Sequence, residues 1–310
     1  IKTTSFFFFF LFPILSYAQS TIETILESYK KDKDLQHAIY SFCVLEAETG
    51  KTVKEYNSEI ALIPASTMKI MTTSAALGIL GKDYTYKTNF YTFTKIDSVS
   101  GTTTNNLLIK GSGDPSFNSS YFYNSDADFF NPIIEKLKTK NIKKINGSII
   151  ADISYFNNTI PSTWIWGDIG NYFGAGSNGL SYHDNKFSIF YNSGSLNTIA
   201  ELESVSPNYF AKKMTIQSNV ISSGTEDDAF VFGDPNGYAR KVTGTIPPNK
   251  THYEVEAEMP EPALYFENQL QSELQKNNLT ITDVKLGTTE QNTLKGNELL
   301  IYTHHSLKLE

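Results

Sequence analysis

The sequence predicts a mixed α/β protein with more than one domain. Its 310 residues exceed the roughly 100–200 residues of a usual domain, and helical and strand-like patterns alternate along the chain. Residues 156–233 are rich in Asn, Ser, Gly and Tyr with short strand-like runs, which indicates a separate β-rich module. With 40% hydrophobic and 19% charged residues, the composition excludes a mainly disordered or collagen-like chain.

Charge and cysteine content exclude several classes of protein. Lys and Arg total 26 against 33 Asp and Glu, so the net charge is −7. Because phosphate binding requires clustered basic residues, this chain is not expected to bind nucleic acid. The single cysteine, Cys43, excludes a disulfide framework and a Cys-based zinc site, and we expect it to be buried in a strand. None of the five histidines has metal-ligand spacing.

The first residues have the pattern of a secretion signal. Lys2 is the positive residue, residues 6–15 are an apolar segment, and a small-x-small cleavage site ends at Ala18. Ten apolar residues interrupted by Pro13 are too few to span a bilayer, which requires about twenty. We therefore predict that residues 1–18 are a signal peptide and that the mature chain is exported to the periplasm without a stable membrane anchor.

Three elements are expected in the N-terminal quarter of the chain. Residues 21–31 carry apolar side chains at helical spacing behind a Thr N-cap, which predicts a helix. Residues 37–45 and 51–56 flank a Glu-Thr-Gly turn and indicate a β-hairpin. Residues 66–80 have a small, apolar face suited to a buried position and end at Gly81, which predicts a second helix.

Strands and helices alternate through the rest of the chain. A glycine-rich turn, residues 111–115, follows one of the strands, and we find no internal repeat or low-complexity linker. The expected strands are residues 84–92, 106–110, 144–153, 279–286 and 298–303, and the expected helices are residues 129–138 and 266–276.

The Ser-Thr-Met-Lys tetrad at residues 66–69 points to nucleophilic chemistry. At positions i and i+3 of a helix, Ser66 and Lys69 project from one face and can hydrogen-bond. A serine becomes a nucleophile when a neighbouring base takes its proton, and a lysine can be that base when burial favours its neutral form. However, S-x-x-K arises by chance about once in a chain of this length, and a second copy stands at Ser28 and Lys31. The tetrad alone therefore does not indicate a function, and its interpretation depends on the sequence around it.

Several further motifs follow the tetrad in a fixed order. They are Gly-Ser-Gly-Asp-Pro at 111–115, a Tyr/Gly-rich segment at 168–185, Gly-Thr-Ile-Pro at 244–247 and a His-x-Ser-type segment at 302–306. In this order the chain resembles, over residues 20–310, the class C low-molecular-mass penicillin-binding proteins, the D-alanyl-D-alanine carboxypeptidase/endopeptidase family.

The resemblance implies a partial serine β-lactamase/transpeptidase-like catalytic domain interrupted by two inserted, β-rich domains. The expected boundaries are residues 19–85 and 298–310 for the catalytic domain, residues 86–153 and 237–297 for inserted domain II, and residues 154–236 for a nested domain III. These are expectations carried by the family's architecture.

The resemblance also implies an activity. Family members of this kind are serine-type D-Ala-D-Ala carboxypeptidases or endopeptidases that act on peptidoglycan stem peptides through an acyl-enzyme. They are penicillin-sensitive, bind β-lactams and need no metal or organic cofactor. Carried over to this chain, Ser66 is the acylated nucleophile and contributes a backbone N–H to the oxyanion hole, and Lys69 is the general base.

Two further motifs of that family are missing from their expected places. The sequence has no Lys-Thr-Gly or Lys-Ser-Gly, and its Ser-x-Asn triplets at Ser116, Ser195 and Ser206 lie in the expected inserted domains, where we interpret them as surface loops. Because the chain stops at Glu310, shortly before the family would supply Ser-x-Asn, we expect a C-terminal truncation and an incomplete active site.

Alternative functions stay open at this point. A non-catalytic, cell-wall-binding descendant of the family would account for the missing motifs as losses. A class A β-lactamase shares S-x-x-K, but residues 125–127 read Ser-Asp-Ala where Ser-Asp-Asn is required. The Tyr, Asn and Gly residues of 167–192 could contact glycan, or they could serve packing within a small β module.

Overall fold

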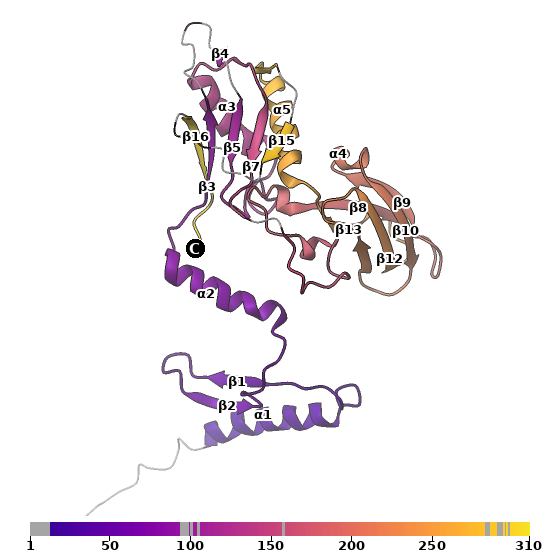
Figure 1. Ribbon diagram of the computed structural model, residues 1–310. Coiled ribbons are helices and arrows are strands. Elements are labelled where there is room, and N and C mark those ends of the chain that lie inside the picture. The colour runs from indigo at the N-terminus through magenta and orange to yellow at the C-terminus, as the bar shows by residue number, and fades with distance from the viewer. Residues whose placement is uncertain are drawn as a thin grey trace, which may run out of the picture. The chain divides into compact units, whose positions relative to one another are not determined.

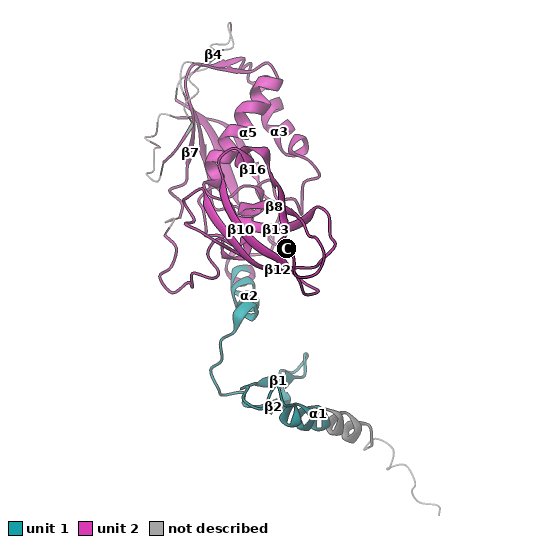
Figure 2. Cartoon of the chain, turned by 90° about the vertical axis from the view of Figure 1, so that its right-hand side faces the viewer, with its two compact units in different colours: residues 1–76 teal, residues 77–310 magenta. Residues whose placement is uncertain are grey.

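The computed structural model describes most of the chain in two compact units, Ile1–Ala76 and Leu77–Glu310 (Figure 2). The apolar segment of the expected signal peptide lies largely outside the described residues, so the signal peptide stays a prediction. The described residues are 13–93, 99, 102–103, 106–156, 159–282, 286–289, 294, 296 and 298–310. None of the helices within these ranges combines the length and the apolar character needed to cross a membrane.

The first unit contains a helix and the predicted hairpin. Helix α1 (Pro13–Lys31) begins earlier than residue 21, where we predicted its start. Strands β1 (Phe42–Leu45) and β2 (Thr52–Tyr56) pair antiparallel, which confirms the hairpin. The first strand is shorter than predicted because turn hydrogen bonds, such as Ala38 N–H to Leu35 O at 2.9 Å, occupy the backbone where it would begin.

The second predicted helix is present, but its apolar face is exposed. A 3₁₀ turn, η1 (Ala65–Thr67), leads into α2 (Met68–Leu80), which ends at Gly81 with φ +82° as predicted. No residue of α2 is buried, and Ile70 is 66% exposed. The prediction of a buried face is therefore wrong for the described structure. Cys43, predicted to be buried, is exposed as well, because no described residue covers either surface.

The second unit is built on a five-stranded mixed sheet in the order β15-β7-β5-β3-β16 (Figure 1). The central strands β5, β7 and β15 are parallel, whereas β3 is antiparallel to both β5 and β16. The strands are β3 (Lys87–Thr92), β5 (Leu107–Lys110), β7 (Ile149–Asp152), β15 (Leu286–Thr289) and β16 (Leu299–His305).

Two amphipathic helices pack on this sheet. Helix α5 (Pro262–Lys276) contacts β7 and β15, and α3 (Asp126–Thr139) contacts β16. Both helices begin a few residues before their predicted starts. In α3 the reason is Ser125, whose hydroxyl accepts the Asp128 N–H at 3.3 Å and caps the helix. Their apolar stripes meet in an aromatic core formed by Phe90, Phe117, Phe129, Phe130 and Phe266.

Two of the predicted strands are each divided between sheets. An Asn-Gly pair interrupts residues 144–153 after β6 (Lys144–Ile145), so only the later part joins the large sheet as β7. Strand β6 instead pairs with β4 (Thr102–Thr103) and β14 (Thr280–Ile281). The prediction of a single strand over residues 279–286 fails in the same way, because β14 and β15 belong to different sheets.

The predicted β-rich module consists of two three-stranded sheets, ordered β13-β8-β9 and β10-β12-β11, which extend to residue 258. Its core continues into that of α5 through ring contacts such as Phe210 with Tyr265, 5.1 Å apart. The partition into three domains stays a prediction. The module contains η2 (Tyr172–Gly174), η3 (His183–Asn185), β8 (Lys186–Asn192), β9 (Glu201–Ser206), α4 (Asn208–Ala211), β10 (Thr215–Ser222), β11 (Asp228–Phe232), β12 (Ala239–Ile246) and β13 (Tyr253–Glu258).

Candidate active site

The structure brings the two predicted site residues together. Ser66 lies in the 3₁₀ turn η1, and Lys69 follows in the first turn of α2. The Lys69 Nζ donates a hydrogen bond to the Ser66 Oγ at 3.2 Å. Both side chains are exposed in the described structure.

The backbone before Ser66 is held in an uncommon conformation. Ala65 has φ +43°, a left-handed value that is rare for a residue with a side chain. The turn is fastened by Thr67, whose backbone N–H and hydroxyl both donate to the Pro64 carbonyl, the N–H at 3.0 Å. Strained residues of this kind persist where surrounding contacts fix them, and they occur often at functional sites.

The second S-x-x-K copy has a different environment. The Ser28 hydroxyl donates to the Ile25 carbonyl at 2.6 Å, within its own helix, and it therefore makes the bond typical of a serine on a helix surface. The neighbouring Lys30 pairs with Glu27 at 2.9 Å. In the copy at Ser66, unlike the copy at Ser28, the lysine donates a hydrogen bond to the serine of its own motif.

The Gly-Ser-Gly-Asp-Pro turn and the His-x-Ser-type segment lie close together in the second unit. The Phe117 and His304 rings are 5.2 Å apart, and the charge of Asp114 acts on His304. Burial lowers the pKa of His304 below its usual value. Gly111 is required in the turn, because a Cβ there would lie 2.1 Å from the Gly179 carbonyl oxygen. The two motifs thus share one packed region, which the sequence could not show.

The three Ser-x-Asn triplets lie in different local structures. At the first, the Ser116 hydroxyl donates to Asp114 at 2.7 Å, and the buried Asn118 amide donates to Asp126 at 2.7 Å. This triplet is not the surface loop that we predicted, because Asn118 is only 4% exposed. Ser195 lies in an exposed turn, as predicted. Ser206 is exposed too, but it ends strand β9 and Asn208 begins α4, so this triplet is not a loop.

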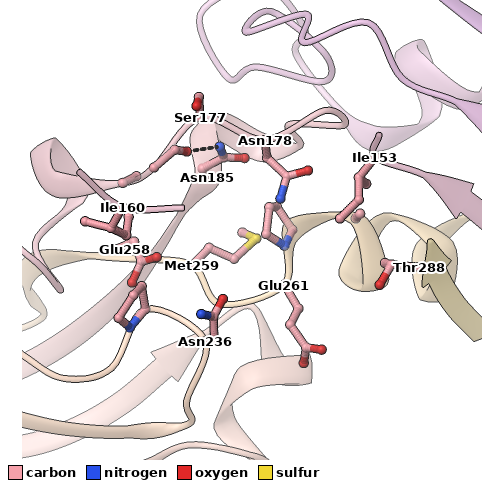
Figure 3. A pocket seen from close by; sticks show the side chains of 15 residues that line it. Ile153, Ile160, Ser177, Asn178, Asn185, Asn236, Glu258, Met259, Glu261 and Thr288 are labelled. Carbon is pink, nitrogen blue, oxygen red and sulfur yellow. Dashed lines mark hydrogen bonds between the residues drawn. The ribbon is translucent and has the colours of Figure 1, made fainter. Parts of the chain in front are cut away.

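A cavity of about 180 Å³ lies between the 175–178 loop, the end of β13 and the start of α5 (Figure 3). Glu258 lines it and pairs with Arg240 at 3.1 Å, yet burial raises the pKa of Glu258 to about 7. Sequence reasoning missed Glu258, since nothing in a strand pattern marks one buried acid. The cavity is smaller than the ~300–1,000 Å³ of usual ligand sites.

No metal centre is visible in the described part of the chain. Within it, no group of three or more His, Cys, Asp or Glu side chains is arranged to hold a metal ion.

Comparison with known proteins identifies one matching family and several sequence relatives. The model of the D-Ala-D-Ala carboxypeptidase 3 (S13) family matches residues 22–310. The D-alanyl-D-alanine carboxypeptidase DacB of Haemophilus influenzae is 26% identical over 50% of this chain and 30% of its own. Penicillin-sensitive carboxypeptidase A of Dictyostelium discoideum is 31% identical over 42% of this chain and 25% of its own length. A D-alanyl-D-alanine carboxypeptidase of Actinomadura is 23% identical over 88% of this chain and 49% of its own length.

Solved structures have the same fold. Penicillin binding protein 4 of Haemophilus influenzae superposes with a TM-score of 0.65 at 20% identity, over 86% of this chain and 56% of that protein. The same protein complexed with a β-lactam superposes with a TM-score of 0.62 at 17% identity, over 92% of this chain and 58% of that protein. These likenesses confirm the predicted mixed α/β fold. The chain spans at most about half the length of the curated relatives.

Proposed function

Because the chain belongs to the D-Ala-D-Ala carboxypeptidase 3 (S13) family, as its motif order predicts, we propose that it carries the acylation centre of a serine D-Ala-D-Ala carboxypeptidase. The proposed substrate is the stem peptide of peptidoglycan, reached after export to the periplasm. The proposed inhibitors are β-lactams. The names of two relatives support this: one is a penicillin-sensitive carboxypeptidase, and one solved relative holds a β-lactam.

The observation that carries the proposal is the 3.2 Å contact between the Lys69 Nζ and the Ser66 Oγ. In its neutral form, the Lys69 amine accepts the hydroxyl proton while the Ser66 Oγ attacks the carbonyl carbon between two D-alanines. The N-terminal end of α2 carries a partial positive charge that favours the developing negative oxygen, and the Ser66 N–H is one proposed donor to the oxyanion.

The attack gives a tetrahedral intermediate, and its collapse breaks the C–N bond between the two D-alanines. The proton passes to the departing amine, D-Ala leaves, and the remaining peptide is esterified to Ser66. Water then adds to the ester carbonyl, the C–O bond to Ser66 breaks, and the serine hydroxyl is restored. A β-lactam reacts through the same attack, but its leaving amine stays tethered, so the whole inhibitor remains on the serine.

An intact-mass measurement after incubation with benzylpenicillin tests this proposal. We expect the chain to gain the mass of one penicillin molecule and the Ser66→Ala variant to gain none, because the ester needs the Ser66 Oγ. Ser28→Ala is the matched control: it removes the serine of the other S-x-x-K copy and should leave the adduct unchanged. An adduct that persists on Ser66→Ala would overturn the nucleophile assignment, and a parent chain without an adduct would overturn the proposal that this chain carries the acylation centre.

A second candidate is a non-catalytic, cell-wall-binding member of the family. One observation favours it: Lys69 is exposed in the described structure. This candidate predicts binding to purified peptidoglycan without a penicillin adduct. The carboxypeptidase proposal predicts peptidoglycan binding together with a penicillin adduct.

A further inference from the structure

One face of the sheet β10-β12-β11 is open to solvent and combines aromatic with polar side chains. Successive residues of a strand point to opposite faces, so paired positions across the three strands share a face. The open face comes from two rows of paired residues that lie two positions apart along the strands. They are Gln217, Lys241 and Phe232, then Asn219, Thr243 and Phe230. The opposite face is closed by buried valines, Val220, Val231 and Val242.

A groove lies along this face with an exposed tryptophan on one wall. Trp166 is 58% exposed and lines the groove. The groove holds about 640 Å³, which is within the ~300–1,000 Å³ range of small-molecule sites. We define the Trp166 groove by six of its lining residues: Trp166, Thr215, Gln217, Phe232, Lys241 and Thr243.

The loop that carries Trp166 is fastened to β11. The side chain of the buried Asn171 accepts the Val231 N–H at 2.8 Å and donates to the Gly167 and Asp168 carbonyls at 2.8 and 3.2 Å. Gly170 has φ +101°, and a Cβ there would lie 2.6 Å from the Val231 carbonyl oxygen. The tryptophan is therefore carried by a loop whose backbone is fixed against the sheet.

The turn that begins at the lining residue Asp234 is also held by hydrogen bonds. The buried Arg240 donates through Nη1 to the carbonyls of Asp234 and Gly237 at 2.9 and 2.8 Å. Its Nη2 pairs with the Glu258 carboxylate at 3.1 Å. The loop that carries Trp166 and the turn that begins at Asp234 are thus each held by hydrogen bonds before any ligand arrives, which lowers the entropic cost of binding.

The side chains of the groove match the chemistry of a sugar. A pyranose ring presents C–H groups on its faces and hydroxyl or acetamido groups around its edge. Flat aromatic surfaces such as Trp166 and Phe232 pack against the faces. The amide of Gln217 and the hydroxyls of Thr215 and Thr243 offer donors and acceptors to the edge.

We propose that the Trp166 groove binds the glycan strand of peptidoglycan, a chain of β-linked, N-acetylated amino sugars. The proposal rests on the proposed function, because the stem peptide is attached to that strand. The exposed Lys241 and Asp234 both line the groove, so among the described residues it presents one free cation and one carboxylate. The sugars are uncharged and the attached peptides carry carboxylates, which Lys241 attracts.

Titration of the whole chain with the N-acetylglucosamine tetramer, followed by calorimetry, tests the proposal. We expect saturable binding that weakens at least tenfold in Trp166→Ala and several-fold in Gln217→Ala, an exposed position where folding is not at risk. Trp164→Ala is the matched control, since Trp164 is exposed but does not line the groove; it should bind as the parent does. The glucose tetramer, which lacks the acetamido groups, should bind more weakly.

Lys241 is tested with a charged ligand. Lys241→Gln should weaken binding of soluble peptidoglycan fragments that carry peptides more than it weakens binding of the uncharged tetramer. A parent chain that does not bind the tetramer, or Trp166→Ala that binds it like the parent, would overturn the proposal. The penicillin adduct on the parent chain is measured separately: an adduct without sugar binding rejects the groove alone, and sugar binding without an adduct rejects the acylation centre alone.

Discussion

At the scale of single residues, Ser66 and Ser28 have the same short motif and different bonds. Ser28 donates to a helix carbonyl at 2.6 Å, whereas Ser66 accepts from Lys69 at 3.2 Å. The difference comes from position. Ser28 stands inside a continuous helix, where a carbonyl of the preceding turn is within reach. Ser66 stands in a 3₁₀ turn before a helix begins, and its hydroxyl meets a side chain instead.

Glu267 is the residue for which pH dependence is clearest. It is fully buried on α5 and accepts the Ala151 N–H at 2.7 Å. Burial raises the pKa of Glu267 to about 8, above its ordinary 4.5. A raised folded-state pKa means that the contribution to stability is complete below pH 4.5 and is lost as pH rises through about 8. We therefore predict that the chain is less stable at pH 9 than at pH 5.

Glu267→Gln isolates this effect. The amide keeps an oxygen that can accept the Ala151 N–H and cannot ionise, so the variant should lose less stability between pH 5 and pH 9. The expected gain over the parent at pH 9 is on the order of 2–4 kcal/mol, because one pKa unit corresponds to ~1.4 kcal/mol. Urea unfolding at both pH values measures it. Equal pH dependence in variant and parent would show that Glu267 does not ionise with this penalty.

At the scale of elements, the close packing of the loop at residues 167–171 leads to a prediction about stability. Gly170→Ala places a Cβ 2.6 Å from the Val231 carbonyl oxygen and forces alanine to φ +101°, so it should destabilise the chain by about 1–3 kcal/mol. Gly167→Ala is the matched control, because a Cβ there meets nothing within 4 Å. The urea midpoint should fall for the first variant only. A similar fall in both would mean that the loop is not fastened as described.

Elements differ in how far the sequence predicts them. The hairpin and α2 were predictable because their patterns and stop signals are local. The split of residues 144–153 was predictable only in part: Asn-Gly marks a break, but which sheet each half joins depends on distant strands. The burial of Glu258 and Glu267 and the closeness of His304 to Phe117 were not predictable, since segments far apart in the chain create them.

At the scale of the whole molecule, the order of the motifs carried more information than any one of them. Ser66 and Lys69 alone match many chains by chance. Together with the segments at 111–115, 168–185, 244–247 and 302–306, they led to the family that the comparison then matched over residues 22–310. The open face with Trp166 could not be found in this way, because it depends on strand pairing and not on any motif.

The distribution of apolar surface leads to the last prediction. Large apolar side chains of α2 are open to solvent, including Met71 at 68% and Ile79 at 82% exposure. Exposed apolar groups gathered on one element favour association, whereas isolated ones do not. We expect concentration-dependent self-association of the chain that Ile79→Glu weakens. Leu196→Glu, at an apolar site outside α2 that is 61% exposed, is the control and should not weaken it. Sedimentation velocity over a range of concentrations distinguishes these outcomes, and a parent chain that stays monomeric throughout would show that the surface of α2 does not drive association.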